Sequence, residues 1–138
     1  MKLQQLVSFQ AFTYIIFGIA FGLYGPLMMA VFSVGDRLQI DALEYWQVAA
    51  FARMLGGILL GFGLLLWAVR GVLNQINQEG QRGIIFALFL SSLIAVIISI
   101  TQQSLIWQSI AGWISTGLFT LFTIAYGYCL FQLQRISS

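Results

Sequence analysis

The sequence predicts an all-α integral membrane protein that folds as a four-helix bundle. Two features of composition lead to this class, because 60% of the 138 residues are hydrophobic and only 7% are charged, against about 25% charged residues in soluble globular domains. The third observation is a pattern of four apolar runs, each long enough to cross a bilayer. We therefore expect one transmembrane domain over residues 1–138, with spans at about 11–32, 45–70, 83–101 and 109–130.

The first span follows a short polar start that carries Lys2. A cleaved signal peptide is the alternative, but the apolar run exceeds the usual hydrophobic region of about 7–15 residues and no clear cleavage site follows it. Gly18 and Gly22 form a Gly-x-x-x-Gly pair that permits close contact with another helix. Gly25 and Pro26 are expected to bend or loosen the last turns, because proline cannot donate the helical hydrogen bond.

The connection over residues 33–44 is the only stretch with clustered charge, and we expect it to form a short interfacial segment. Asp41 and Glu44 have the spacing of a capping box, in which each side chain accepts a hydrogen bond from a free backbone N–H at the helix start. Both acids also favour the positive end of the helix dipole. The second span should therefore begin at this point.

The second span carries one charge, Arg53, where a charge is costly. Arg53 lies in line with Ala49, Gly57 and Gly61 at a four-residue spacing, which makes a single stripe on a helix. Its side chain leans toward the helix N-terminus and can reach the membrane interface, which favours an ion pair or a lipid anchor. The alternative is a binding site, so Arg53, Gly57 and Gly61 are the candidate ligand- or partner-binding residues.

Glycines leave the second span with little side-chain bulk. They let a neighbouring helix, a lipid tail or a flat cofactor approach the backbone. Packing against another helix of the bundle is the expected use, and the four glycines concerned are Gly56, Gly57, Gly61 and Gly63.

The third and fourth spans are apolar apart from hydroxyl side chains. In the third, three serine hydroxyls can bond back to carbonyls of their own helix. In the fourth, small and hydroxyl residues recur at near-helical spacing, and the residues of both sets are Ser91, Ser92, Ser99, Gly112, Thr116, Thr120 and Thr123. Short connections predict that neighbouring helices pack antiparallel.

The distribution of basic residues predicts the orientation in the membrane. If the N-terminus is cytoplasmic, four basic residues lie inside (Lys2, Arg70, Arg82 and Arg135) and only Arg37 lies in an outer loop. Cytoplasmic loops carry the excess of Lys and Arg. Both termini are therefore predicted to be cytoplasmic, in a multi-pass protein of the cell membrane or of an inner or internal membrane.

The sequence lacks the residues that most enzymes and cofactor proteins need. It has no histidine, one cysteine and four carboxylates, which give no recognisable zinc, haem or di-iron ligand set and no metal site. No span contains a carboxylate for proton- or cation-coupled transport, and no catalytic motif is present. Six basic residues spread over the chain form no nucleic-acid patch. We therefore predict a protein that is not an enzyme.

A glycine-rich run in the second span carries a resemblance to a known group. The run is FARMLGGILLGFGLLLW, with the pattern Arg53-x-x-Gly56-x-x-x-x-Gly61-x-Gly63-x-x-x-Trp67, and it follows a first span that ends in Gly-Pro. Over Gly18 to Arg70, it resembles small bacterial four-span membrane proteins of uncharacterised function, DoxX-like in appearance. The resemblance implies a four-helix bundle without an assigned reaction, and association with a redox partner.

The remaining expectation for function is contact within the membrane. We expect a non-catalytic accessory or structural subunit that binds a larger membrane complex, a second copy of the chain or lipids through small-residue helix faces. The alternative is a binder or carrier of a small hydrophobic or anionic amphipathic molecule that uses Arg53. No cofactor is predicted, although a lipid or lipophilic cofactor is compatible with the sequence.

Overall fold

The computed structural model describes residues 3–32 and 42–137. This part of the chain is helical throughout apart from its connections. The elements are α1 (Leu3–Val31), α3 (Ala42–Val69), α4 (Gln78–Gln102), a π-helical turn η1 (Gln103–Trp107) and α5 (Ile110–Ser137). The expected interfacial segment before Ala42 and the predicted cap at Asp41 lie outside the described residues.

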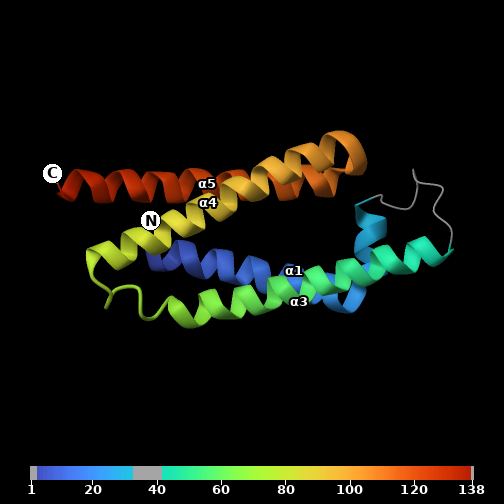
Figure 1. Ribbon diagram of the computed structural model, residues 1–138, viewed down its shortest axis with the longest axis horizontal. Coiled ribbons are helices and arrows are strands. Elements are labelled where there is room, and N and C mark those ends of the chain that lie inside the picture. Colours follow the sequence, from blue (N-terminus) through green and yellow to red (C-terminus); the bar gives the residue numbers. More distant parts are fainter. Residues whose placement is uncertain (1–2, 33–41, 138) are drawn as a thin grey trace.

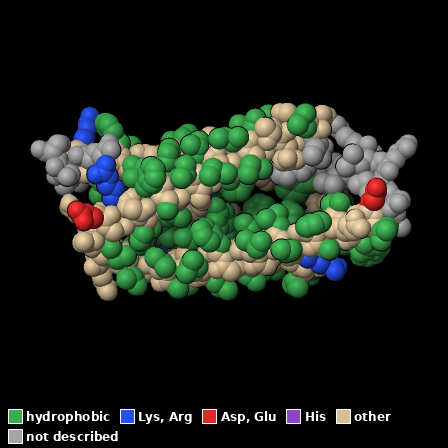
Figure 2. All heavy atoms as spheres, viewed as in Figure 1, with side chains coloured by type: hydrophobic (Ala, Val, Ile, Leu, Met, Phe, Trp, Pro, Cys, Tyr) green, Lys and Arg blue, Asp and Glu red, His purple; other side chains and the backbone are tan. Residues whose placement is uncertain are grey.

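All four α-helices are long and apolar enough to cross a membrane. Their outer surfaces carry many large apolar side chains, with Leu23 and Ile110 at least 70% exposed, and green hydrophobic atoms cover much of the face in Figure 2. Such surfaces suit lipid rather than water as the solvent. The predicted four-helix membrane protein is confirmed at this level.

The helices form two pairs, α1 with α3 and α4 with α5, which lie as two layers (Figure 1). The α3–α4 connection and the C-terminal end of α5 lie at the left of that view, and the turn between α4 and α5 lies at the right. Contacts within each pair far exceed those between the pairs. Most of the packing therefore lies within each pair rather than between the pairs.

The helices α1, α3 and α4 begin before the expected spans, and α4 and α5 end after them. The polar start of α1 continues the helix from Leu3, and α4 begins at Gln78 because the Asn77 side chain caps it, accepting a hydrogen bond of 3.0 Å from the Gly80 N–H. At the other end of α4 the expected turn is the π-helical η1, and the chain reverses at Gln108 with a left-handed φ of 43°.

The predicted bend in α1 is confirmed. Tyr24 leaves the helical conformation, with φ −117° and ψ 35°, two residues before Pro26. Proline removes one helical hydrogen bond and its ring clashes with the carbonyl four residues earlier, so the preceding turn opens.

Glycines bring the backbones of α1 and α3 into direct contact. A methyl group added at Gly18 would lie 2.5 Å from the backbone nitrogen of Leu60, and one added at Gly56 would collide with the backbone of Gly22. Gly63 is equally close to α1, because a methyl group there would lie 2.9 Å from the Ile15 nitrogen. Gly18 therefore has the packing role predicted for the Gly-x-x-x-Gly pair, whereas a methyl group added at Gly22 would meet no atom within 4 Å.

The buried core lies toward the end of the molecule that holds the α3–α4 connection, and we call this the packed end. Its largest members interdigitate from all four helices and from the connection itself. The core residues are Leu6, Val7, Ala11, Tyr14, Leu66, Leu73, Ile85, Leu88, Phe122 and Tyr126.

A buried hydrogen-bond chain runs through this core. Tyr126 on α5 donates its hydroxyl hydrogen to Oε1 of Gln10 on α1, and Nε2 of Gln10 donates to the hydroxyl oxygen of Tyr14 at 2.9 Å. Gln10 and Tyr126 are fully buried and Tyr14 is 6% exposed. The chain joins the two helix pairs, since Gln10 lies on α1 and Tyr126 lies on α5. A buried amide without these partners would be strongly unfavourable in an apolar interior.

Candidate functional site

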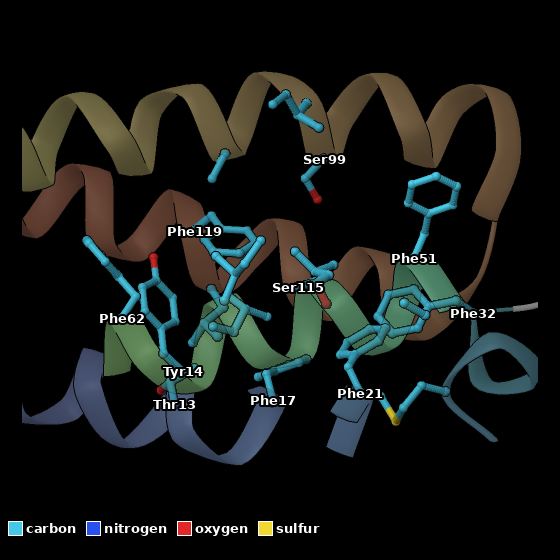
Figure 3. Close-up of a pocket in the computed structure, with 18 of the residues that line it drawn as sticks. Thr13, Tyr14, Phe17, Phe21, Phe32, Phe51, Phe62, Ser99, Ser115 and Phe119 are labelled. Atoms are coloured by element: carbon cyan, nitrogen blue, oxygen red, sulfur yellow. The ribbon is translucent and has the colours of Figure 1, made fainter. Parts of the chain in front are cut away.

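An apolar cavity of about 670 Å³ lies between the two helix pairs. It extends from Tyr14, at the edge of the packed end, toward Phe32 and Phe51 (Figure 3), and we call this part of the molecule the hollow end. Figure 2 shows the hollow from outside, surrounded by hydrophobic atoms of both layers. Binding sites for small molecules typically have volumes of about 300–1,000 Å³ and predominantly apolar walls.

Across part of the cavity, large rings on one layer lie opposite small residues of α4. Along one wall Phe17 and Phe21 of α1 stack at a centroid distance of 6.3 Å, and Phe21 and Phe32 are tilted at 5.7 Å. From α3, Phe51 and Phe62 add further rings. On the opposite wall α4 presents a stripe of small residues at four-residue spacing, Ser91, Ala95 and Ser99. Side chains of this size cannot reach across to fill the space.

All four helices contribute to the lining. The residues share an apolar or hydroxyl character. They are Thr13, Tyr14, Phe17, Phe21, Met28, Met29 and Phe32 with α1; Val48, Phe51, Ala52, Leu55, Ile58, Leu59 and Phe62 from α3; and Ser91, Ala95, Ile98, Ser99, Ser115, Leu118 and Phe119 from α4 and α5. Among these described lining residues no side chain is charged, so the cavity suits an uncharged molecule.

Most of the hydroxyl groups in the wall already donate to the protein. Thr13 donates to the Phe9 carbonyl at 2.9 Å and Ser115 donates to the Ala111 carbonyl at 3.0 Å. Ser99 lies 2.6 Å from the Thr116 hydroxyl, and it is the donor there because Thr116 gives its own hydrogen to the Gly112 carbonyl. Ser99 therefore joins α4 to α5 rather than bonding back to its own helix as expected.

Tyr14 forms the boundary between the cavity and the packed core. Its ring lies against Phe62, with centroids 5.9 Å apart, and meets Phe122 edge-on at 6.5 Å. Aromatic contacts on two sides hold the ring in one orientation. In Figure 3 its hydroxyl points from α1 toward α5.

The structure places the predicted binding residues away from this cavity. Arg53 is exposed on α3, outside the cavity lining, and its aliphatic stem covers Gly25, where an added methyl group would lie 3.2 Å from the Arg53 Cγ. Within residues 3–32 and 42–137, no carboxylate is in ion-pair contact with Arg53. Gly57 and Gly61 are also exposed, and a methyl group added at either would meet no atom within 4 Å.

The α3 glycines therefore divide into two sets. Gly56 and Gly63 pack against α1, whereas Gly57 and Gly61 face outward. Packing inside the bundle was expected for all four, and it holds for the first two. Consecutive residues on a helix lie 100° apart, so one position decides between a helix contact and the lipid-facing surface.

Sequence reasoning missed the cavity-lining residues. The available signal was the small-residue stripe on the third span, Ser91, Ala95 and Ser99, together with the aromatic residues of the first and second spans. The described part of the chain contains no group of three His, Cys, Asp or Glu residues that could hold a metal ion.

Comparison of the chain with protein-family models, curated proteins and solved structures finds no match. The DoxX-like resemblance therefore stays a prediction, and the candidate site rests on its own geometry.

Proposed function

We propose that the protein is a non-catalytic multi-pass membrane protein that binds an uncharged lipophilic molecule between its two helix pairs. The observation that supports this proposal is the apolar cavity of about 670 Å³, which opens beside the bundle and has no charged residue in its described wall. Because the helices cross the membrane, the opening faces lipid tails, and a hydrophobic molecule can enter without passing through water.

The proposal is tested by filling the cavity. Ala52 lines it, while Ala50 lies two residues away on the exposed face of α3. Ala52→Trp should remove a bound molecule because the indole occupies its space, and Ala50→Trp should leave it in place. The protein is purified from its membrane in a mild detergent, and extracted lipophilic molecules are quantified by mass spectrometry. Equal recovery from both variants and the parent would refute the proposal.

A second candidate is the accessory subunit expected from the sequence. It is favoured by the exposed backbone at Gly57 and Gly61, where nothing within the described chain approaches. Another membrane-protein subunit or a second copy could pack there. In this case Gly57→Leu or Gly61→Leu should reduce co-purification of the partner, while unchanged assembly would remove this candidate.

For the membrane arrangement, we propose antiparallel neighbouring helices with both termini on the cytoplasmic side of the cell membrane. The support is the excess of basic residues at the termini and in the connection after Arg70. In a Cys129→Ser background, cysteine at Gln39 should react with an impermeant reagent from outside, and cysteine at Gln78 only after permeabilisation. The reverse pattern would invert the orientation.

A further inference from the structure

The buried hydrogen-bond chain ends on a donor at the cavity wall. Tyr126 gives its only hydroxyl hydrogen to Gln10, and Gln10 gives an amide hydrogen to the Tyr14 oxygen. Each tyrosine hydroxyl has one hydrogen, so the Tyr14 hydroxyl accepts from Gln10 and keeps its own hydrogen. No acceptor for that hydrogen is found among the residues that the structure describes.

The direction of the chain follows from burial. If the Gln10 amide were reversed, Tyr14 would donate to Gln10 and the unused hydroxyl hydrogen would lie on Tyr126. Tyr126 is 0% exposed and does not line the cavity, so no acceptor could reach that hydrogen. With Tyr126 as the first donor, the unused hydrogen instead lies on Tyr14, which lines the cavity and is only 6% exposed. An unpaired hydroxyl in an apolar wall is unfavourable, and a ligand acceptor would relieve it.

The other hydroxyls of the wall do not compete for this role. Thr13 and Ser115 donate their hydroxyl hydrogens to backbone carbonyls, and Ser99 donates to the Thr116 hydroxyl. Ser91 also lines the cavity, but it is exposed rather than buried, and its hydroxyl can bond back to a carbonyl of its own helix. Tyr14 is thus the buried hydroxyl of the described lining with a hydrogen to give.

We propose that Tyr14 donates a hydrogen bond to a carbonyl oxygen of the bound molecule, so that the ligand is an uncharged lipophilic carbonyl compound. This inference rests on the proposed function. Two preceding hydrogen bonds polarise the Tyr14 hydroxyl and strengthen it as a donor. The carbonyl lies at the packed end of the cavity, and the apolar remainder extends along Phe17 and Phe21 toward Phe51. A bilayer phospholipid is disfavoured, since no charged residue of the described wall receives its headgroup.

The experiment uses two photoreactive probes that differ in one group: a long-chain methyl ketone with a diazirine, and the alkane of the same length with the same diazirine. The full chain is labelled in phosphatidylcholine nanodiscs. We expect the ketone to label the parent about two- to tenfold more strongly than the alkane, the range for one net hydrogen bond. Tyr14→Phe keeps the ring and should lower this ratio to about one, with alkane labelling unchanged.

Two variants serve as controls. Tyr128 is exposed and outside the lining, so Tyr128→Phe should keep the parental ratio. Ala52→Trp should reduce labelling by both probes. If Ala52→Trp reduces both but the ketone-to-alkane ratio is the same in the parent and in Tyr14→Phe, the role of Tyr14 is refuted and the lipophilic site stands. If Ala52→Trp changes neither, the proposed function and this inference both fail.

A measurement on the parent protein covers the case in which Tyr14→Phe does not fold. The ketone is labelled with ¹³C at the carbonyl, and its infrared stretch is compared between nanodiscs with and without the protein. A hydrogen bond from Tyr14 should shift the stretch to lower frequency. An unchanged stretch at saturating protein would overturn the inference.

Discussion

The two ends of this bundle are built from the same four helices, but one end is a packed core and the other holds a cavity. At the packed end, Leu6, Phe122 and Tyr126 fill the space between the layers, and Gln10 connects them by hydrogen bonds. At the hollow end a cavity separates the layers, and the aromatic rings of α1 and α3 lie across it from small residues such as Ala95. The comparison shows that the buried core is concentrated at one end, whereas the other end holds the cavity.

The sharpest test of this difference uses two phenylalanines one turn apart on α5. Phe122 is fully buried at the packed end, and Phe119 lines the cavity. Phe122→Ala should lower the free energy of unfolding by about 3 kcal/mol, the lower end of the range for such changes, because a membrane protein loses packing but little transfer energy from water. Phe119→Ala should cost less, about 1–2 kcal/mol, because Phe119 is only partly buried against that core and its other side faces the cavity.

Both values can be measured by unfolding in mixed micelles with increasing sodium dodecyl sulfate. Equal losses for the two variants would mean that the two ends contribute alike to stability, and the comparison would no longer hold.

A smaller effect is expected where α1 meets α3. Gly56→Ala should destabilise by about 1–3 kcal/mol, because the new methyl group collides with the Gly22 backbone, which cannot move as a side chain can. Gly57→Ala is the matched control. It has open space around it and should be neutral or gain a few tenths of a kcal/mol from helix propensity. Denaturation in micelles separates them, and a harmless Gly56→Ala would contradict the close contact.

A third prediction concerns the join between α4 and α5 beside the cavity. Ser99→Ala removes the hydrogen bond to Thr116 and should cost about 0.6 kcal/mol, the average for such bonds between membrane helices. Ser92→Ala is the control, because the Ser92 hydroxyl is buried without a partner in the described part of the chain. Its removal should be neutral or slightly stabilising. If Ser92→Ala proves the more harmful change in thermal unfolding, this assignment is wrong.

The smallest effect is expected at Arg53. Arg53→Leu and Arg53→Lys should change the free energy of unfolding by less than about 0.5 kcal/mol, because the side chain is exposed and lies outside the cavity. Recovery of the lipophilic molecule should match the parent when normalised to the inserted protein. If both variants instead lost the bound molecule while their stability was unchanged, Arg53 would be part of the binding site and the ligand would be anionic.

The parts of the fold that the sequence predicts depend on local chemistry. Four apolar runs predict four spans, and Pro26 predicts the bend that Tyr24 displays. Some helices extend beyond the expected spans because polar residues near the ends of helices can be buried or can cap, as Gln10 and Asn77 do. Polarity alone does not distinguish these residues from a connection.

The cavity depends on information that no single span contains. Its shape follows from the rotation of each helix, which brings Ser99 opposite the rings of another layer. The same rotation explains why Arg53 misses the site: it lies one residue beyond Ala52, which is on the wall. A charge in an apolar run marks an unusual residue, but its neighbours across the bundle decide whether it meets a ligand.

The division into two helix pairs has a consequence for how the protein is made. The ribosome completes α1 and α3 by Val69, before any of α4 exists, and their glycine contacts need nothing from the second half of the chain. Sequence-local contacts form early, and N-terminal units fold first during synthesis. We therefore expect the wall of aromatic rings to reach the bilayer as an open surface, on which the second pair settles afterwards. In this order of events, the cavity forms last, when the second pair covers the first.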